Sequence, residues 1–562
     1  IIFIINLYIL FILIVFLAFF LRTFRLSDFP SGFTPDEASF GYDAYSLLKT
    51  GKDQWGHSFP LVLESFGDFK SPLYAYLTIP FIFIFGFKKW VVRFPNVVLG
   101  TASVYIIYLL VYQILVRDGK EKNTNFYVRG TAFLSSFLLA ISPWHVMMSR
   151  GAFEANLTTI FLPLSLYFFL KGLRNTKYFT LGSIFAGINI FSYHSAKLVT
   201  PLVFIFTIVV FRKELVKNFG IYHLISGFIV LVFAGMFFLS LHSGSLIRVS
   251  DVSIFKLSLI EASSERTKAI NMGANPQLAR IFYNKYQAGL RHFVTNYLSY
   301  FSPEFYFFKG PSEATYGMIP GRGVLYWFEL PLFLAFVFYI VKNFNNKRLW
   351  PVLFWYLVSP IPAALSLGPG YAANRAVIQL PSIQIFLAIG FFHFLSLMSK
   401  IRYRYAFGII YFLFSMLFFF YFLLDYFLLS PVKISKDMLY GRMETALWLI
   451  NNARGKEIVM SRSLSEPHIY VAFASKLDPK IYQEATSNWN YKELGLKWVD
   501  QMPSYKLGDY IFESIDPYKY LGKKDLVLVG KPEEFKKGVN PIKIINYLDG
   551  DEAILVVETP LK

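Results

Sequence analysis

The chain has 562 residues, of which 55% are hydrophobic, 19% aromatic and only 16% charged. This composition excludes an ordinary soluble domain and indicates a polytopic membrane protein, because apolar runs of about 20 residues recur along the chain. The formal net charge of +19 fits Lys and Arg in cytoplasmic loops better than nucleic-acid binding. Because the chain has no cysteine, disulfides and thiolate metal sites are excluded.

The first apolar run, residues 1–21, is predicted to span the membrane, since no small-residue cleavage site of a signal peptide follows it. The chain opens at Ile1 inside this run, so we expect the natural N-terminus to lie upstream. Residues 73–87 contain Pro80 and are short for a span, which favours an interfacial or re-entrant helix. Ten further spans are predicted at 94–116, 126–147, 155–171, 178–193, 198–211, 221–241, 324–341, 349–367, 376–397 and 405–429.

The distribution of Lys and Arg supports this topology. If residues 73–87 do not cross, the cation-rich loops all fall on one face, which is then the cytoplasmic one. These loops carry Arg117/Lys120/Lys122, Lys171/Arg174/Lys177, Arg212/Lys213/Lys217, Lys342/Lys347/Arg348 and Lys400/Arg402/Arg404. We therefore predict about eleven transmembrane helices, with residues 22–93 forming a first outer loop that contains juxtamembrane helices. Arg22 and Arg25 follow the first span directly and are cations on the predicted outer side, which argues against this placement of residues 22–93.

Two more long segments lie on the outer side in this topology. Residues 242–323 form a long outer loop, and residues 431–562 differ sharply in composition from the rest of the chain. The tail shows a helical pattern followed by short apolar, strand-like runs, as expected for an α/β domain of about 130 residues. The predicted organisation is an all-α transmembrane domain over 1–430 and an extracytoplasmic α/β domain over 431–562.

Two adjacent acids, Asp36 and Glu37, follow the first span directly. Carboxylates beside a membrane are costly unless they have a function. After Pro35, two acids also suit the first turn of a helix, where the helix dipole favours negative charge. The two interpretations are compatible, because the N-terminus of a helix can hold a catalytic carboxylate rigidly.

Other polar residues recur at the same membrane depth on the outer face. They are Lys70 and Arg93 in the first outer loop, Arg150 and Glu154 in the next outer turn, His194 and Lys197 in the third, and Arg375 in the fifth. Together they predict a polar cavity suited to a substrate with a lipid tail and a charged head. Each also has a structural alternative, since Arg150 and Glu154 could pair on a helix surface and Lys70 could anchor at the interface.

At these residues the chain resembles bacterial members of glycosyltransferase family 39, the polyprenyl-phosphate-sugar-dependent enzymes of the GT-C fold. The relatives include protein O-mannosyltransferases and lipid A aminoarabinose transferases. The resemblance covers roughly residues 1–430. The matching positions are Pro35-Asp36-Glu37-Ala38 with Tyr42, Lys70-Ser71-Pro72-Leu73-Tyr74, Val92-Arg93-Phe94-Pro95, Ser142-Pro143, Ser149-Arg150 with Glu154, Tyr193-His194, and Arg375 with Pro381.

The resemblance implies that Asp36 is the catalytic base and that Lys70 contacts the lipid phosphate. Glu37 and Glu154 are predicted to act beside the base, by positioning the acceptor or orienting the cations. We expect Arg150 or Arg375 to assist Lys70 at the phosphate. The remaining predicted substrate-binding residues are Tyr42, Arg93, His194 and Lys197.

A metal is not indicated by these residues. Some lipid A transferases have a metal-ligating Glu directly before the phosphate-contacting Lys, whereas this chain has Phe69 there. A divalent metal remains possible, but the sequence requires no cofactor.

The predicted function is inverting transfer of a sugar from a polyprenyl phosphate to a hydroxyl group of a protein, glycolipid or cell-wall glycan. Transfer would take place on the outer face of the plasma membrane, without nucleic acid as a partner. The alternative is a transporter or flippase for a lipid-linked or anionic substrate, because charges at a membrane cavity also line transport pathways. A third hypothesis is an oligosaccharide polymerase or ligase. The acids in the first outer loop argue against it.

Overall fold

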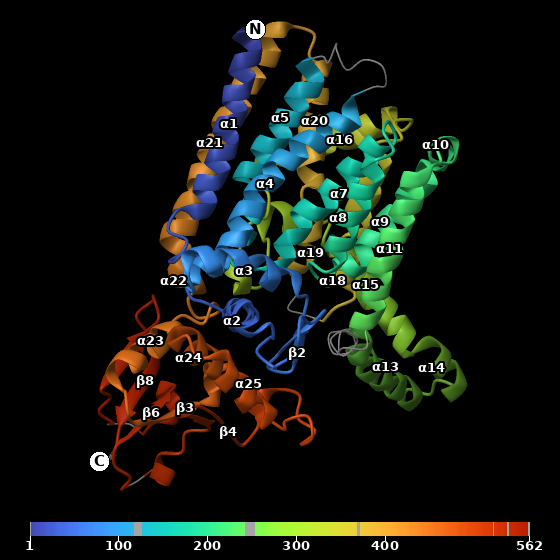
Figure 1. Ribbon diagram of the computed structural model, residues 1–562. Coiled ribbons are helices and arrows are strands. Elements are labelled where there is room, and N and C mark those ends of the chain that lie inside the picture. Colours follow the sequence, from blue (N-terminus) through green and yellow to red (C-terminus); the bar gives the residue numbers. More distant parts are fainter. Residues whose placement is uncertain are drawn as a thin grey trace.

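The computed structural model describes residues 2–116, 126–241, 253–367, 371–520, 522–536 and 539–559. Figure 1 shows an upright bundle of helices above a smaller α/β unit formed by the C-terminal part of the chain. Two parts of the predicted topology lie outside the described residues: the loop cations Arg117, Lys120 and Lys122, and the first residues of the long outer loop, 242–252.

The bundle consists of apolar helices, as lipid requires, because a helix satisfies all its backbone hydrogen bonds internally. Each predicted span overlaps one of them. They are α1 (Ile2–Thr23), α4 (Lys89–Leu115), α5 (Phe126–Ile141), α7 (Thr158–Gly172), α8 (Tyr178–Ile190), α9 (Ala196–Val210), α11 (Ile221–Ser240), α16 (Leu330–Lys342), α17 (Trp350–Val358), α20 (Ser382–Leu397) and α21 (Ile401–Leu424). Shorter helices connect them, including α6 (Pro143–Met148), α10 (Arg212–Lys217), α18 (Ile361–Ala364), α19 (Ala373–Ala376) and α22 (Ser430–Ile434).

Helix length supports fewer spans than the sequence predicts. Within the described ranges, three helices are long and apolar enough to cross a membrane alone: Lys89–Leu115, Ile221–Ser240 and Ile401–Ile434. A fourth is obtained if the bent pair 373–379 and 382–397 counts as one span. The predicted count of about eleven is therefore not confirmed by length and composition, although the chain is mostly helical.

The first outer loop folds into two short helices and a hairpin. The helix α2 (Pro35–Thr50) begins at Thr34, whose hydroxyl accepts the Glu37 N–H while the Glu37 carboxylate accepts the Thr34 N–H. This reciprocal capping box fixes the start of the helix. The helix α3 (Leu73–Phe85) has 13 residues, so its length of about 20 Å is less than the apolar thickness of a bilayer.

The hairpin places Lys70 at the end of its second strand. Strands β1 (Leu63–Ser65) and β2 (Asp68–Lys70) pair antiparallel, and only Phe66 and Gly67 join them. Both linking residues have a positive φ, 51° and 111°, as tight hairpin turns often require. A Cβ on Gly67 would lie 2.1 Å from the carbonyl oxygen of Lys497, so the turn is pressed against the C-terminal region.

The C-terminal region is built on a six-stranded sheet with the order β4-β5-β3-β6-β8-β7. The central β3 pairs in parallel with β5 and β6, whereas the outer pairs are antiparallel. The strands are β3 (Glu457–Ser461), β4 (Ser504–Leu507), β5 (Tyr510–Glu513), β6 (Leu526–Gly530), β7 (Lys543–Asn546) and β8 (Glu552–Glu558). The helices α23 (Arg442–Asn452), α24 (Pro467–Ser475) and α25 (Pro479–Ser487) lie between the sheet and the bundle (Figure 1).

The bundle and the C-terminal unit share one hydrophobic core at their junction. This core joins Phe33 and Tyr42 of the first outer loop to Phe473 and Tyr482 of α24 and α25. The Phe33 and Phe473 ring centroids are 5.0 Å apart, and the Tyr470 hydroxyl donates to the Phe33 carbonyl oxygen at 2.8 Å. The C-terminal unit is therefore docked directly on the loop that carries the candidate acids.

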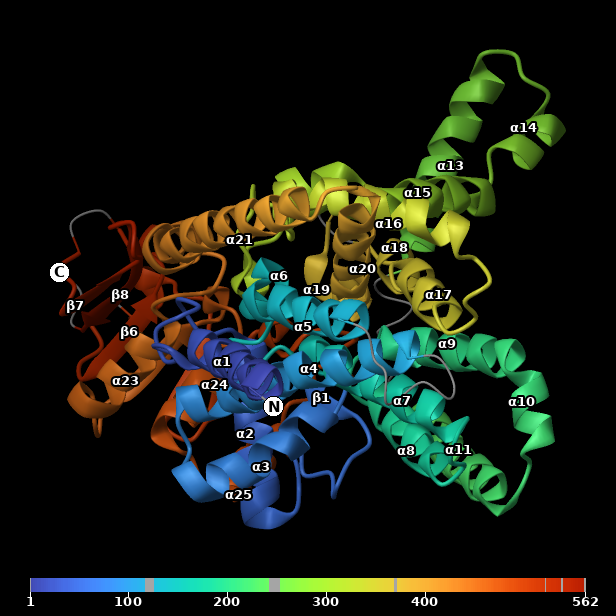
Figure 2. The same ribbon diagram turned by 90° about the horizontal axis from the view of Figure 1, so that it is seen from above.

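The long segment after α11 forms a second protrusion at the same end of the bundle. It contains α13 (Ile254–Asn271), α14 (Pro276–Phe282) and α15 (Lys285–Ser299). α13 and α14 extend away from the bundle in both views (Figures 1 and 2), whereas α15 is bonded to it through Asn296 and Tyr297. The short helix α10, which carries Arg212, Lys213 and Lys217, lies at the opposite end (Figure 1). The segments predicted to be outside thus share one end of the molecule.

The two cations that weigh against the charge bias have local partners. Arg22 is fully buried and donates to the carbonyl oxygens of Ala18, Leu139 and Ala140 and to Nδ1 of His145. Arg25 pairs with Asp28 at 2.8 Å. Because the charge of Arg22 is bonded inside the bundle, it does not act as a free loop cation.

Candidate active site

Asp36 and Lys70 form an ion pair at the end of the bundle that faces the C-terminal unit. Asp36 Oδ1 lies 2.7 Å from Lys70 Nζ. The lysine side chain is only 2% exposed, whereas the aspartate is 43% exposed. The ammonium group also lies 5.0 Å and 5.2 Å from the ring centroids of Phe40 and Phe66. The pair therefore combines a buried cation with a carboxylate that substrates can reach.

The position of each partner follows from its local structure. Asp36 is the second residue of α2, where the positive end of the helix dipole favours a carboxylate. Lys70 ends the hairpin, and the aromatic rings around it exclude water, so its charge is less screened than at a surface. A cation in such a place attracts an anionic group strongly.

Glu37 has different surroundings from its neighbour. It is fully buried and binds Arg93 through two contacts, Nε to Oε1 at 2.8 Å and Nη2 to Oε2 at 3.0 Å. Oε1 also accepts the N–H of Ala152 at 3.0 Å. The remaining donors of Arg93 bind carbonyl oxygens of the first outer loop, at Leu26, Pro30 and Gly32. This arrangement holds α2, α4 and the second outer turn together and leaves Glu37 away from solvent.

The two other predicted phosphate-binding cations are bonded to backbone. Arg150 is fully buried and donates to the carbonyl oxygens of Leu21, Phe24 and Phe29, so it does not form the helix-surface pair with Glu154 that the spacing allows. Arg375 donates to the Ser366 hydroxyl at 2.7 Å and to the Leu367 carbonyl oxygen at 2.5 Å. These contacts indicate a structural role for Arg150. Arg375 is only partly buried and lines a small cavity with Tyr300, so its predicted contact with the phosphate stays a prediction.

Tyr42 is buried at the junction with the C-terminal unit. Its hydroxyl donates to the Leu477 carbonyl oxygen at 3.1 Å, and its ring centroid is 4.9 Å from that of Tyr482. Burial raises the pKa of the Tyr42 hydroxyl well above its ordinary value. These contacts indicate that Tyr42 joins the two parts of the protein, and its predicted contact with a substrate stays a prediction.

The third outer turn does reach the hairpin. Nε2 of His194 lies 3.1 Å from the carbonyl oxygen of Phe69, the residue before Lys70. Lys197 follows in the first turn of α9, where it is partly buried. Glu154 begins the 3-10 helix η2 (Glu154–Leu157) and is 7% exposed. Burial, and also the charges of Glu37 and Glu154, raise the pKa of the Tyr74 hydroxyl, so Glu154 lies near the start of α3.

A buried polar network beneath the ion pair was not predicted from the sequence. The Gln54 amide donates to the hydroxyl groups of Ser39 and Ser65, which are themselves 2.7 Å apart, and the Gln54 N–H donates to Asp43. Burial raises the pKa of the Asp43 carboxyl group well above its ordinary value, as does the charge of Asp53, whereas the Gln54 N–H and Lys70 lower it. The network ties α2 to β1 and so sets the position of Asp36 relative to the hairpin.

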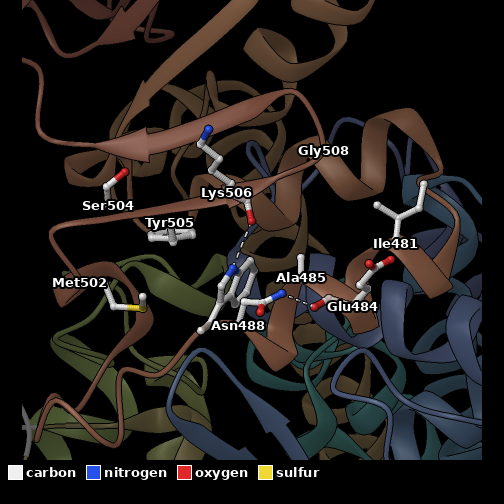
Figure 3. Close-up of a pocket in the computed structure, with 10 residues that line it drawn as sticks. Ile481, Glu484, Ala485, Asn488, Met502, Ser504, Tyr505, Lys506 and Gly508 are labelled. Carbon is white, nitrogen blue, oxygen red and sulfur yellow. Dashed lines mark hydrogen bonds between the residues drawn. The ribbon is translucent and has the colours of Figure 1, made fainter.

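Within the described ranges, no group of three or more His, Asp or Glu side chains is placed to hold a metal ion. A cavity of about 420 Å³ lies instead in the C-terminal unit, between α25 and β4. Figure 3 shows Tyr505 and Lys506 of β4 on one side of it and Glu484 and Asn488 on the other. The cavity is therefore separate from the Asp36–Lys70 pair.

Residues 69–237 match the family model described as dolichyl-phosphate-mannose-protein mannosyltransferase. The predicted resemblance to family 39 is confirmed. The matched segment begins at the residue before Lys70 and includes Arg150, Glu154 and His194. The predicted enzyme class, a polyprenyl-phosphate-sugar-dependent glycosyltransferase, is confirmed with it.

The fold resembles that of a solved protein along its whole length. The crystal structure of ArnT from Cupriavidus metallidurans in the apo state superposes with a TM-score of 0.50 and 10% identity, covering 98% of this chain and 97% of that chain. The prediction of a mostly helical GT-C fold with a C-terminal sheet region therefore holds.

Two further structures are similar to a lesser degree. ArnT from the same organism bound to undecaprenyl phosphate has a TM-score of 0.49 at 9% identity, covering 99% of this chain and 98% of that chain. The archaeal oligosaccharyltransferase AglB from Archaeoglobus fulgidus, in complex with an inhibitory peptide and a dolichol-phosphate, has a TM-score of 0.49 at 14% identity, covering 93% and 69%. No curated protein matches the chain in sequence.

Proposed function

We propose that the protein is an inverting glycosyltransferase that moves a sugar from a polyprenyl phosphate to a hydroxyl group of an acceptor. The observation that carries the proposal is the Asp36–Lys70 pair, a reachable base 2.7 Å from a buried cation. The acceptor hydroxyl gives its proton to the Asp36 carboxylate while its oxygen attacks the anomeric carbon. The bond from that carbon to the phosphate oxygen breaks, and polyprenyl phosphate leaves with the electron pair.

Lys70 stabilises the departing phosphate, whose negative charge increases as the bond breaks. Its ammonium group is enclosed by Phe40 and Phe66, where electrostatic interactions are stronger than in water. When the donor phosphate binds Lys70, it also competes for the cation that Asp36 holds. A carboxylate that loses a cationic partner binds a proton more readily, so donor binding prepares Asp36 to act as the base.

The membrane arrangement is part of the proposal. Eleven spans place α2, the hairpin, the α13–α15 segment and the C-terminal domain, 431–562, on the extracytoplasmic side of the plasma membrane. The grouping of these elements at one end of the bundle supports it, as does the cationic α10 at the other end. The donor then reaches Lys70 from the outer leaflet, and the acceptor is a protein, a glycolipid or a cell-wall glycan.

The test is transfer by the purified protein in proteoliposomes containing a labelled polyprenyl-phosphate sugar. We expect Asp36→Asn to bind the donor but to release polyprenyl phosphate at least about 100-fold more slowly, the usual loss for a missing general base. Asp28→Asn, at an exposed acid of the same loop, serves as the matched control and should retain wild-type activity. Near-normal transfer by Asp36→Asn would refute the base assignment, and vesicle uptake of intact donor would support a transporter.

A further inference from the structure

A strained segment of the C-terminal unit lies close to the candidate active site. Ser465 and Glu466 both have left-handed backbone conformations, with φ of 58° and 49°, although neither is glycine. Such residues persist only where the surroundings impose the conformation, and they cluster at functional sites. Here the imposing group is Asp500, whose Oδ2 accepts the Glu466 N–H at 2.6 Å while its Oδ1 accepts the Tyr505 hydroxyl.

The same segment is packed on the hairpin that carries Lys70. The Val499 N–H donates to the Phe66 carbonyl oxygen at 3.0 Å. The rings of Phe66 and His468, two residues after Glu466, have centroids 5.3 Å apart. Lys70 Nζ lies 5.2 Å from the centroid of that same Phe66 ring. Val499, which precedes the Asp500 that binds Glu466, and His468, two residues after Glu466, therefore both contact the turn beside the buried cation.

The charges of the active-site pair act on the Glu466 carboxyl group. Burial raises its pKa to about 8, as do the charges of Asp500 and Asp36, while Lys70 lowers it. The single ammonium of Lys70 already pairs with Asp36, so a third carboxylate nearby is disfavoured. The titratable and charged groups around Glu466 are Asp36 and Lys70 from the first outer loop, and Arg442, Arg462, His468, Tyr470, Asp500 and Tyr505 from its own domain.

We propose that Glu466 is an acceptor-binding residue that the C-terminal domain contributes to the reaction centre. Its protonated carboxyl group donates a hydrogen bond to an oxygen of the acceptor, beside the hydroxyl group whose proton Asp36 removes. The inference rests on the proposed transferase function and extends it, because it gives the C-terminal domain a part in holding the acceptor. An ionised Glu466 has no proton to donate, and its charge competes with the donor phosphate for Lys70.

Because the protonated form of Glu466 is the active one, the rate of transfer should fall as the pH rises. As pH rises through about 8, Glu466 loses its proton and transfer declines. Glu466→Gln keeps an N–H donor of the same shape that does not ionise. Glu466→Ala removes the donor at every pH.

The experiment compares kcat/KM for the acceptor between about pH 6.5 and 9.5, a range that brackets this ionisation. We expect the alkaline decline of the wild type to be absent in Glu466→Gln. Glu466→Ala should raise the acceptor KM about tenfold at neutral pH, the usual effect of a lost hydrogen bond. Glu493→Gln, at an exposed acid of the same domain, is the control and should follow the wild-type profile.

A second measurement separates failure of this inference from failure of the proposed function. Binding of undecaprenyl phosphate to each variant is measured at neutral pH and about one unit above the ionisation. Weaker binding at high pH in the wild type, but not in Glu466→Gln, supports the placement of Glu466 beside Lys70 even if no variant transfers sugar. An alkaline decline of transfer that is the same in Glu466→Gln and the wild type overturns the inference, as does an unchanged acceptor KM in Glu466→Ala.

Discussion

The two neighbouring acids of α2 differ in their exposure to solvent. Asp36 pairs with Lys70 through Oδ1 and is partly exposed, whereas Glu37 is buried between Arg93, the Ala152 N–H and the Thr34 N–H. An isosteric amide can still offer one oxygen to Lys70 in place of Asp36. It cannot offer two oxygens to Arg93 in place of Glu37, because its NH₂ group would face N–H donors.

We therefore expect Glu37→Gln to destabilise the protein more than Asp36→Asn does. Breaking a buried, doubly bonded ion pair costs on the order of 3–5 kcal/mol, whereas the exposed carboxylate of Asp36 contributes less. The measurement is the thermal unfolding midpoint of each variant in detergent, with Asp36→Asn as the matched isosteric control. Equal midpoints would mean that Glu37 does not hold the loop, and that its role must be sought at the acceptor.

At this scale the sequence singled out residues of the candidate site, but it did not specify their contacts. The motif resemblance singled out Asp36 and Lys70, which the structure brings together. It also proposed Arg150 and Arg375 as phosphate ligands, but a cation at a membrane boundary has the same sequence signal whether it faces a cavity or binds carbonyl oxygens. Asp43 follows Asp36 by two helical turns and so shares its helix face, a signal that was available for the buried network.

The β1–β2 hairpin is the element that connects the C-terminal unit to the ion pair. Its turn is held by the Val499 N–H bond to Phe66 and by the close approach of the Lys497 carbonyl oxygen to Gly67. The second strand then ends at Lys70. Movement of the turn would therefore shift the ammonium group relative to Asp36.

Gly67→Ala should displace the hairpin and lower transfer, because its Cβ would lie 2.1 Å from a backbone oxygen that belongs to a packed domain. We expect a loss of about 1–3 kcal/mol in stability, typical of overpacking, together with easier proteolysis between the two parts of the chain. Gly56→Ala is the control. Gly56 also has a positive φ, 86°, but nothing lies within 4 Å of its added Cβ. If both variants lose transfer equally, backbone strain and not domain contact explains the effect.

The local sequence pattern is sufficient to predict the helices of the bundle, but not their lengths or their long-range contacts. Apolar runs predicted the helices of the bundle, because every lipid-facing backbone group must be bonded within its helix. Several apolar runs are interrupted, as at the bend between α19 and α20. Fewer helices are therefore long enough to cross a membrane than the number of apolar runs suggests. The sequence around Glu466 does not predict its proposed role in acceptor binding, because its neighbours on the hairpin lie about 400 residues earlier in the chain.

At the scale of the whole molecule, the polarity of the bundle decides whether the proposed chemistry takes place outside the cell. The C-terminal unit shares one end of the molecule with α2 and β2, which carry Asp36 and Lys70, and α10 lies at the other end. A polyprenyl-phosphate donor in the outer leaflet can reach Lys70 only if the first of these ends is extracytoplasmic. The predicted charge bias favours that orientation, because it assigns the cation-rich loops to the cytoplasmic side.

Because the chain has no cysteine, single cysteines can report this orientation without background substitutions. Asp509→Cys lies on the exposed β4–β5 turn, and Lys217→Cys lies on the exposed α10. With a membrane-impermeant thiol reagent applied to intact cells freed of any outer barrier, we expect Asp509→Cys to react at once. Lys217→Cys should react only after the membrane is permeabilised, and the parent protein, which lacks a thiol, should not react in either state. The reverse pattern would place the Asp36–Lys70 pair in the cytoplasm and require a donor presented from the inner leaflet.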